Sequence, residues 1–243
     1  NHKGSNGSVL ILGGWGNMQG AGFLAGLAAA RTGVGKVFIC TPNANFRPME
    51  LIGIDSKLED LKSCLKEVNV VVAGPGLNEE ADEHLHLVWK SKLPIVLDAY
   101  GLRWLAQNNL PKRTNNWIGT PHQGETMDLL GKHKTENNRF VQLTILNKIY
   151  GGQWILKGPG TLVGPNPTYV NNFANGILAT AGTGDVLAGI AGGMIAHGYS
   201  KAGALATYIH SESARKILAQ KSSRIIASDL LKNIGIVMNE LEK

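Results

Sequence analysis

The chain has 243 residues, of which 43% are hydrophobic and 17% are charged, and its formal net charge is +6. This length suits one large α/β domain better than two small ones, and no apolar run is long enough to span a bilayer. Lysine and arginine are scattered rather than clustered, which argues against a nucleic-acid partner. We therefore expect the positive charge to attract an anionic small molecule.

Glycine is the unusual feature of the composition, because the 31 glycines exceed the usual ~7% of residues. They cluster in short groups after apolar runs, which is typical of ligand-binding turns rather than of disorder. The two cysteines, Cys40 and Cys64, have no metal-binding spacing. The first residues carry neither a signal-peptide pattern nor an initiator Met, so we expect a cytoplasmic protein with upstream residues missing from this sequence.

Short apolar strands alternate with helical patterns along most of the chain. We expect strands at residues 9–12, 36–40, 70–73, 94–97, 117–119 and 153–156, and helices at residues 20–31 and 79–89. Continuous apolar strands between helices predict a parallel sheet that is covered on both faces.

The pattern changes after Gly160. The runs 161–163 and 168–170 flank a turn of Gly, Pro and Asn, which predicts an antiparallel pair of strands. Three helices are expected after this pair, at residues 185–197, 201–220 and 229–240, the last with Ser228 as its N-cap. No linker or repeat interrupts the chain, so we predict a single domain over residues 1–243, built as a three-layer α/β/α sandwich with a mostly parallel central sheet.

Glycine-rich or polar turns follow five of the predicted parallel strands. These turns are Gly13-Gly14, Gly74-Pro75-Gly76, Asp98, Thr120-Pro121-His122 and Lys157-Gly158. The carboxyl ends of parallel strands meet at one edge of a sheet, where ligands bind in open α/β folds. Five such ends predict one site at this edge more strongly than any single turn would.

The segment from Ala179 to Ile190, ATAGTGDVLAGI, is the most informative part of the chain. It places small residues directly before Asp185, which opens an apolar helical run. Glycines let backbone N–H groups approach an anion closely, and a helix N-terminus adds partial positive charge. A carboxylate at this position lies beside a bound phosphate, as expected where a base removes a proton from a group that faces a nucleotide.

Each candidate residue also has a purely structural interpretation. An isolated Asp185 would be a helix N-cap, although an acid between a glycine-rich turn and a buried helix is more often functional. Lys157 follows a strand and precedes Gly158-Pro159-Gly160-Thr161, so it is either a phosphate contact or a solvated lysine. His122 is a candidate ligand-binding residue, and Glu125 would cap a helix or help to place a metal.

Familiar nucleotide-binding fingerprints are missing from the sequence. There is no Walker A pattern with its paired Lys and Ser/Thr, and Gly13-Gly14-Trp15-Gly16 does not match the dinucleotide fingerprint. Any nucleotide must therefore be held in another way. His84 and His86 lie two residues apart on a predicted helix, so they point to different faces and do not form a metal-binding pair.

These segments resemble the ADP/ATP-dependent NAD(P)H-hydrate dehydratases, which have a ribokinase-like fold. The most specific matches are Thr120-Pro121-His122 with Gly124-Glu125, and Ala179 to Gly193. The other matches, in the family's order, are His2-Lys3-Gly4, Val9 to Gly14, Gly20-Ala21 with Ala28 to Gly35, Thr41-Pro42, Gly74-Pro75-Gly76-Leu77, Asp98-Ala99, and Leu156-Lys157-Gly158 with Gly160-Thr161.

The resemblance implies an enzyme that repairs the hydrated form of NADH or NADPH. A phosphoryl group from ADP or ATP would activate the added hydroxyl, and loss of phosphate would restore the nicotinamide ring. Phosphoryl transfer needs a base, donors for the developing charge and a metal that neutralises the phosphates. Asp185 would be the base, the N–H groups of Gly182, Thr183 and Gly184 the anion hole, and Mg²⁺ the metal, whose ligands the sequence does not identify.

Residue by residue, the resemblance also implies two binding regions. The hydrate-binding residues fall on Ala21, Gly74, Gly76, His122 and Asp185. The nucleotide contacts fall on Lys157, Gly158, Pro159, Gly160, Thr161 and Gly184. Members of the family often assemble into tetramers, so the resemblance further implies a homo-oligomer.

The chain departs from the family's pattern at four positions. Tyr100 replaces a second Asp and Arg103 replaces an Asn, while Phe173 and Ile177 add bulk where the family keeps room for a nucleotide. Two alternatives therefore stay open. One is a small-molecule kinase of the same fold, and the other is a catalytically impaired paralogue that binds nucleotide. The preference between ADP and ATP, and between the two hydrates, stays open as well.

Overall fold

The computed structural model describes residues 6–113, 116–133, 135–173, 175–220 and 224–241. Within these ranges, nine strands form one sheet in the order β3-β2-β1-β4-β5-β6-β7-β8-β9. The strands are β1 (Ser8–Leu12), β2 (Lys36–Cys40), β3 (Ile52–Ile54), β4 (Val70–Ala73), β5 (Ile95–Leu97), β6 (Trp117–Gly119), β7 (Gln153–Leu156), β8 (Leu162–Gly164) and β9 (Tyr169–Val170). Strands β1 to β7 pair in parallel, whereas β8 and β9 are antiparallel, as the sequence predicted.

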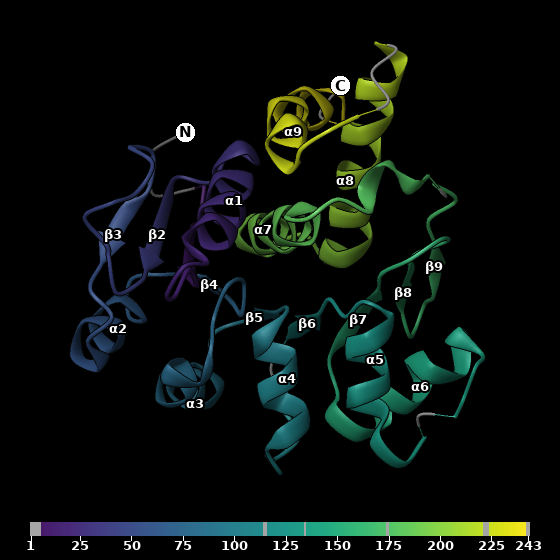
Figure 1. The fold of residues 1–243 in the computed structure, drawn as a ribbon, viewed down its shortest axis with the longest axis horizontal. Helices are drawn as coiled ribbons and strands as arrows, with labels where there is room; N and C mark the ends of the chain where they lie inside the picture. The colour runs from purple at the N-terminus through teal and green to yellow at the C-terminus, as the bar shows by residue number, and fades with distance from the viewer. Residues whose placement is uncertain (1–5, 114–115, 134, 174, 221–223, 242–243) are drawn as a thin grey trace.

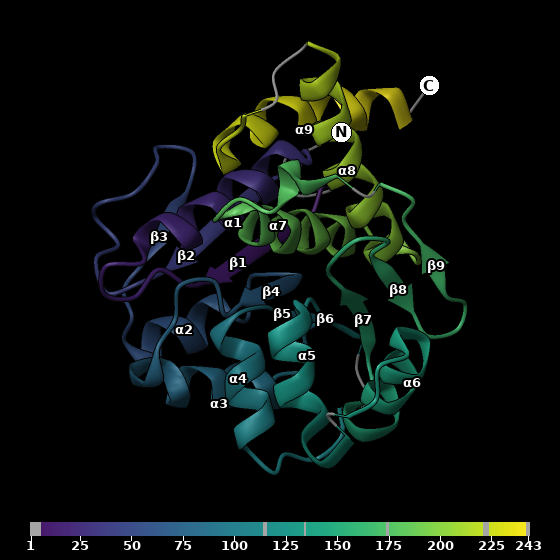
Figure 2. The same cartoon turned by 45° about the vertical axis from the view of Figure 1, so that its right-hand side comes forward.

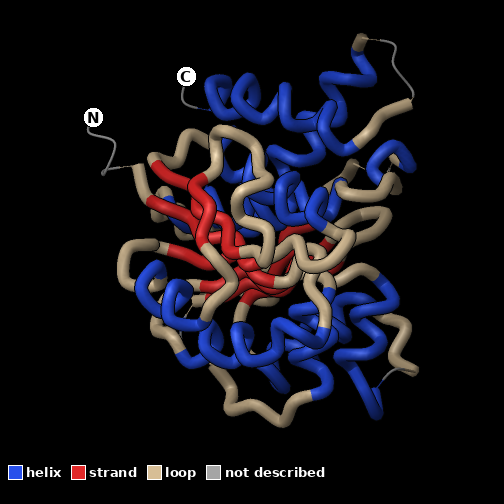
Figure 3. The backbone as a smooth tube through the Cα atoms, turned by 60° about the vertical axis from the view of Figure 1, so that its left-hand side comes forward, coloured by secondary structure: helices blue, strands red, loops and turns tan. Residues whose placement is uncertain are grey.

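Helices cover both faces of this sheet (Figures 1 and 2). One face carries α1 (Gln19–Arg31), α7 (Thr183–Ala196), α8 (Ala202–Ala219) and α9 (Ala227–Leu241). The other carries α2 (Leu58–Cys64), α3 (Asp82–Lys90), α4 (Tyr100–Gln107), α5 (Gln123–Leu130) and α6 (Arg139–Tyr150). Figure 3 shows the strands sandwiched between these two layers, which confirms the predicted α/β/α arrangement.

Successive apolar side chains of each strand point to opposite faces of the sheet and so build two separate cores. In β1, Val9 and Ile11 face the layer of α1 and α7, while Leu10 and Leu12 face the layer of α3 and α4. All four side chains are fully buried. Burial on both faces explains why these strands are continuous apolar runs rather than alternating ones.

Helix α7 lies at the centre of its layer because three of its four glycines leave room for close neighbours. A Cβ atom on Gly189 would lie 2.1 Å from the carbonyl oxygen of Ala25 in α1. A Cβ on Gly192 would lie 2.4 Å from Val72 Cγ2 in β4, and one on Gly193 would lie 2.2 Å from Thr32 Oγ1. The glycines therefore allow α7 to contact both α1 and the sheet, with its N-terminus at the carboxyl edge of the strands.

The helix boundaries differ from the expected ones in three places. Helix α7 begins at Thr183, two residues before Asp185. The helix expected at 79–89 is divided into a 3₁₀ turn, Glu79–Ala81, and α3. The assignment of Ser228 as an N-cap is wrong, because α9 begins at Ala227 and the Asp229 carboxylate instead accepts a hydrogen bond from the N–H of Ile226 at 3.0 Å.

Some features were not predicted or lie outside the described residues. Strand β3 and helices α2, α4 and α6 have no counterpart among the expected elements. The matching segment His2-Lys3-Gly4 lies outside the described ranges. Within these ranges, no helix combines the length and the apolar character that a membrane span requires.

The contact between α7 and α1 gives a test of the packing. We expect Gly189→Ala to lower the free energy of unfolding by about 2 kcal/mol or more, because the new methyl group collides with the backbone of α1. Gly20→Ala is the matched control, since a Cβ on this glycine of α1 meets no atom within 4 Å. Urea unfolding should show a loss only for Gly189→Ala, and equal stability of the two variants would contradict this account of the packing.

Candidate active site

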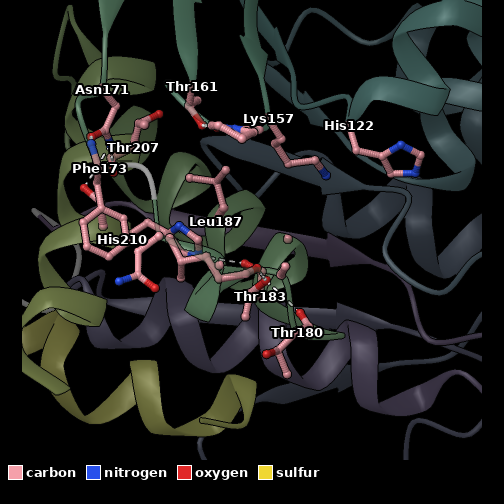
Figure 4. A pocket seen from close by; sticks show the side chains of 18 of the residues that line it. His122, Lys157, Thr161, Asn171, Phe173, Thr180, Thr183, Leu187, Thr207 and His210 are labelled. Carbon is pink, nitrogen blue, oxygen red and sulfur yellow. Dashed lines mark hydrogen bonds between the residues drawn. The ribbon is translucent and has the colours of Figure 1, made fainter. Parts of the chain in front are cut away.

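A cavity of about 660 Å³ opens at the carboxyl edge of the sheet, between the loop after β7, the segment before α7 and helix α8 (Figure 4). Cavities of roughly 300–1,000 Å³ accommodate ligands of nucleotide or drug size. Seven of the predicted site residues line it: His122, Lys157, Gly158, Pro159, Thr161, Thr183 and Gly184. In Figure 4, Lys157 and His122 lie towards one end of the cavity, and Asn171, Phe173 and Thr207 towards the other.

The turn before α7 adopts the conformation that its glycine permits. Gly182 caps the helix with φ 87° and ψ −13°, in the left-handed region that favours glycine. The Thr183 hydroxyl donates hydrogen bonds to the carbonyl oxygens of Leu178 at 2.7 Å and Thr180 at 2.8 Å. These bonds hold the turn in a fixed position against the first residues of α7.

The first turn of α7 presents unpaired backbone donors to the cavity. The Thr183 N–H donates to the Thr180 carbonyl at 3.3 Å, a long hydrogen bond. Among the described residues, the N–H groups of Gly184 and Asp185 have no such acceptor. The Gly182 N–H also has no acceptor among the described residues, so of the predicted anion hole only the Thr183 N–H is engaged, and Asp185 adds a further donor. Unpaired N–H groups at a helix N-terminus bind anions.

Lys157 and Asp98 form a buried ion pair at the ends of β7 and β5. Lys157 Nζ lies 2.8 Å from Asp98 Oδ1, and the two side chains are 20% and 3% exposed. The Thr120 hydroxyl donates to the same oxygen of Asp98 at 2.7 Å. Burial favours the neutral form of Lys157, but Asp98, Glu125 and Asp185 outweigh burial and raise the pKa of Lys157. Lys157 therefore remains charged beside the cavity and is not a solvated lysine.

The backbone around Asp98 is arranged so that its carboxylate faces Lys157. Ala99, the next residue, has a positive φ of 45°. A Cβ on Gly74 would lie 1.7 Å from the Asp98 carbonyl oxygen, so only glycine fits beside this turn. Gly74 thus has a structural role in placing Asp98, whatever its part in binding.

Asp185 has an unusual proton affinity. Its pKa is raised from 3.8 to about 7, first by burial and then by the nearby Asp98 and Glu125 carboxylates, while Lys157 lowers it. A carboxyl group with a pKa near neutrality exchanges a proton readily at physiological pH, which is the property that a general base needs.

His122 and Glu125 form a reciprocal cap at the start of α5. His122 Nδ1 accepts from the N–H of Gly124 at 3.0 Å, and Glu125 Oε2 accepts from the N–H of His122 at 2.8 Å. The capping interpretation of Glu125 is therefore confirmed. The Glu125 carboxylate also lies 3.9 Å from Lys157 Nζ, so the cap connects to the buried ion pair.

The other predicted site residues do not line the cavity; they are Ala21, Gly74, Gly76, Gly160, Gly182 and Asp185 itself, which directly follows the lining residue Gly184. Ala21 is in the first turn of α1, and a Cβ on Gly76 would lie 3.1 Å from its methyl group. A Cβ on Gly182 would lie 2.6 Å from Leu24 of the same helix. The turn that carries Asp185 is thus bounded by α1 on one side and by the cavity on the other.

The four departures from the family's pattern lie in different surroundings. The Tyr100 hydroxyl donates to Asp82 Oδ1 at 2.9 Å, and Arg103 is exposed on α4. Ile177 is 8% exposed and packs in the core, so it does not fill the cavity. Phe173 does line the cavity, and the Arg215 guanidinium lies 5.2 Å from its ring centre.

Sequence reasoning noted Asp98 and Thr120 at their strand ends but assigned neither a role in the site. It also missed His210 of α8, which is buried and contacts the Thr183 carbonyl. The signal for Asp98 was a lone acid directly after an apolar strand. His210 gave no signal, because a single histidine within a helix has no motif.

A magnesium ion at this edge would depend on the nucleotide. Among the described residues, no three His, Cys, Asp or Glu side chains are grouped to hold a metal. Asp98, Glu125 and Asp185, which all interact with Lys157, are the carboxylates available. This set fits Mg²⁺, which commonly binds one or two carboxylates together with substrate phosphates and water.

The ion pair gives the first test of the site. We expect Lys157→Met to lower the free energy of unfolding by roughly 3 kcal/mol, because it leaves the buried Asp98 carboxylate without its cation. Adding Asp98→Asn, which keeps an acceptor for Thr120, should restore most of this loss. Urea unfolding of both variants measures the effect, and a double variant no more stable than Lys157→Met would argue against a direct pairing.

The raised pKa of Asp185 gives a second test. The folded protein holds the Asp185 proton up to about pH 7, whereas an unfolded Asp releases it near 3.8, so the stability linked to this proton is complete below pH 3.8 and is lost progressively as pH rises to about 7. The amide of Asp185→Asn cannot ionise, so the variant avoids this loss of stability. The difference in melting temperature between Asp185→Asn and the wild type should therefore be larger at pH 8 than at pH 5. Asp128→Asn, at an exposed position on α5, is the control and should show the same small difference at both pH values. A gain at Asp185 that does not change with pH would refute the raised pKa.

Comparisons with known proteins agree with this geometry. A family model described as NAD(P)H-hydrate dehydratase matches residues 9–235. The bifunctional NAD(P)H-hydrate repair enzyme Nnr of Coxiella burnetii is 37% identical, in an alignment that covers 98% of this chain and 51% of that protein. The ADP-dependent (S)-NAD(P)H-hydrate dehydratase of Neisseria meningitidis is 35% identical, over 95% of this chain and 82% of that protein. The chain thus spans about half the length of the bifunctional relatives.

Solved structures have the same fold. A ribokinase-like superfamily protein of Enterococcus faecalis superposes with a TM-score of 0.90 at 23% identity, covering 99% of this chain and 89% of that one. The ADP/ATP-dependent NAD(P)H-hydrate dehydratase of Bacillus subtilis, co-crystallised with ATP and Mg²⁺, gives a TM-score of 0.85 at 29% identity and covers 100% of this chain and 92% of that one. The predicted ribokinase-like fold is confirmed, and the chain belongs to the NAD(P)H-hydrate dehydratase family.

Proposed function

We propose that this chain catalyses the ADP- or ATP-dependent dehydration of hydrated NADH or NADPH. The observation that carries the proposal is the position of Asp185, whose pKa is about 7, at the start of α7, where it follows the unpaired N–H of Gly184. A base and an anion site on adjacent residues are what transfer of a phosphoryl group to a hydroxyl requires. Membership of the family supports the choice of substrate.

The reaction begins with transfer of a phosphoryl group. Asp185 accepts the proton of the added hydroxyl, and the hydroxyl oxygen bonds to the terminal phosphorus of the nucleotide. The bond from that phosphorus to its bridging oxygen breaks, which releases AMP from ADP or ADP from ATP. The N–H groups of Gly184 and Asp185 and the Lys157 ammonium stabilise the negative charge of the phosphoryl oxygens. Mg²⁺, when bound with the nucleotide, neutralises part of the phosphate charge.

Elimination completes the repair. The C–O bond of the phosphate ester breaks with its electron pair and releases inorganic phosphate, a far better leaving group than hydroxide. A proton leaves the adjacent carbon, and the ring double bond of NADH or NADPH forms.

The two sides of Asp185 suggest where the substrates bind. The nucleotide would occupy the cavity along Lys157, Gly158, Pro159, Gly160, Thr161 and Gly184, of which all but Gly160 line it. The hydrated nicotinamide would lie towards Ala21, Gly74, Gly76 and His122. Asp185 would then face the hydroxyl from between the two.

Other features of the chain fit the same function. All described strands belong to one sheet, which supports a single catalytic domain over residues 1–243. Cys40 and Cys64 are free and buried, which fits a reducing cytoplasm. Assembly into a homo-oligomer is proposed from the resemblance alone.

Turnover of hydrated NADH tests the function. Supplied with ADP or ATP and Mg²⁺, the protein should restore the absorbance of reduced nicotinamide and release inorganic phosphate. Asp185→Asn should lose at least about 10²-fold in kcat and still bind ADP, because it removes the base and keeps the amide donors.

The products also separate the alternatives. A stable phosphorylated hydrate without free phosphate would indicate a kinase, and nucleotide binding without turnover in the wild type would indicate an impaired paralogue. Equal kcat values for Asp185→Asn and the wild type would remove Asp185 from the role of base.

A further inference from the structure

His210 of α8 is a buried histidine whose role the proposed reaction leaves unassigned. Its side chain lines the cavity, and the residue is only 7% exposed. Its Nε2 lies 2.8 Å from the carbonyl oxygen of Thr183 in the first turn of α7. Figure 4 shows His210 reaching from α8 towards this turn.

The hydrogen bond fixes which ring nitrogen carries the proton. A carbonyl oxygen can only accept a hydrogen bond, so Nε2 must donate it. Burial, assisted by the nearby Lys157 charge, lowers the pKa of His210 to about 4, although the bond to Thr183 opposes this shift. At neutral pH the ring is therefore uncharged and carries its single proton on Nε2.

The contacted carbonyl belongs to the same peptide unit as the N–H of Gly184. The peptide unit is planar and trans, so its C=O and N–H point in opposite directions. A donor that holds the Thr183 carbonyl from α8 therefore restrains the direction of the Gly184 N–H, in addition to the hydrogen bonds within α7. It also polarises the peptide, which strengthens that N–H as a donor.

Because α7 begins at Thr183, the same carbonyl also accepts the helical hydrogen bond from the N–H of Leu187, so His210 is its second donor and the one that comes from another helix. The remaining hydrogen bonds of Thr183 do not act on this carbonyl. Its hydroxyl bonds to the carbonyls of Leu178 and Thr180, which fixes the preceding loop rather than the peptide unit. Among the described residues, the Gly184 N–H has no acceptor, so its direction matters for a bound anion. His210 is the side chain that holds the carbonyl end of this unit.

We propose that His210 is a positioning residue that aims and strengthens the Gly184 N–H as a phosphate donor, by donating from Nε2 to the Thr183 carbonyl. This inference rests on the proposed function, because it assigns the anion at Gly184 to the phosphate of ADP or ATP. His210 acts through the peptide and does not itself react.

Two amide substitutions separate this role from a general packing role. The side-chain N–H₂ of His210→Gln reaches the place of Nε2 and keeps the bond to Thr183, whereas that of His210→Asn reaches only the place of Nδ1. We expect His210→Gln to bind ADP within about threefold of the wild type and His210→Asn to bind it roughly tenfold more weakly or worse. Isothermal titration with ADP measures both. With hydrated NADH, the kcat of His210→Asn should fall too, since the same donor stabilises the transition state.

A spectroscopic readout accompanies the binding series. The amide proton of Gly184, observed by ¹⁵N-edited NMR of the ligand-free protein, should resonate at the same downfield position in the wild type and His210→Gln and move upfield in His210→Asn. If His210→Asn does not fold, His210→Phe takes its place, because it also lacks the donor. Ser213→Ala is the control, since this buried hydroxyl of α8 has no hydrogen-bond partner in the described structure and its loss should leave ADP affinity unchanged.

The proposal is overturned if the Asn or Phe variant binds ADP as tightly as the Gln variant, or if the Gly184 resonance is the same in all of them. These outcomes are independent of the proposed function. If the wild type binds ADP and the His210 variants show the expected order of affinities, but no NADH forms, the dehydratase activity is refuted and the role of His210 stands. Wild-type protein that does not bind ADP would refute both.

Discussion

The candidate active site at the carboxyl edge of the sheet depends on one buried cation. Lys157, with its ammonium 2.8 Å from Asp98, is surrounded by three carboxylates that come from separate segments of the chain. Without this cation, Asp98, Glu125 and Asp185 would repel one another in a partly buried region, and the ends of β5, β7 and α7 could not lie so close together. In the same region burial raises the pKa of Asp185 to about 7, Asp98 and Glu125 act in the same direction, and Lys157 opposes them.

The second constraint is the close packing at three glycines of α7. Gly189, Gly192 and Gly193 let the helix pack directly on the backbone of α1 and on the side chains of Val72 and Thr32, and these close contacts fix the position of its N-terminus. The anion-binding N–H groups belong to the first turn of that helix, and the glycine contacts lie roughly 8 to 14 Å further along it, at about 1.5 Å of rise per residue. Any slip of the helix would move the donors by the same amount. Rigid packing and phosphate binding are thus connected through one helix.

Much of this architecture could be predicted from the sequence. The apolar runs before Gly13, Gly74, Asp98, Thr120 and Lys157 identified the parallel strands and the edge where their ends meet, because strands buried on both faces are continuous and apolar. Short elements such as β3 and α2 lacked a comparable pattern. The pairing of Lys157 with Asp98 could not be predicted, since the two residues are 59 positions apart and only the strand order brings them together. The role of Gly74 beside Asp98 depends on a backbone approach that no pattern of residue types encodes.

The central claim is that the phosphate of the nucleotide binds at the first turn of α7, directly beside the Asp185 carboxylate. A crystal structure of the protein with ADP and Mg²⁺ tests it most directly. The account predicts a terminal phosphate oxygen within about 3 Å of the Gly184 and Asp185 amide nitrogens, at hydrogen-bond distance. A terminal phosphate that lies away from both amides, at another part of the cavity, would contradict it.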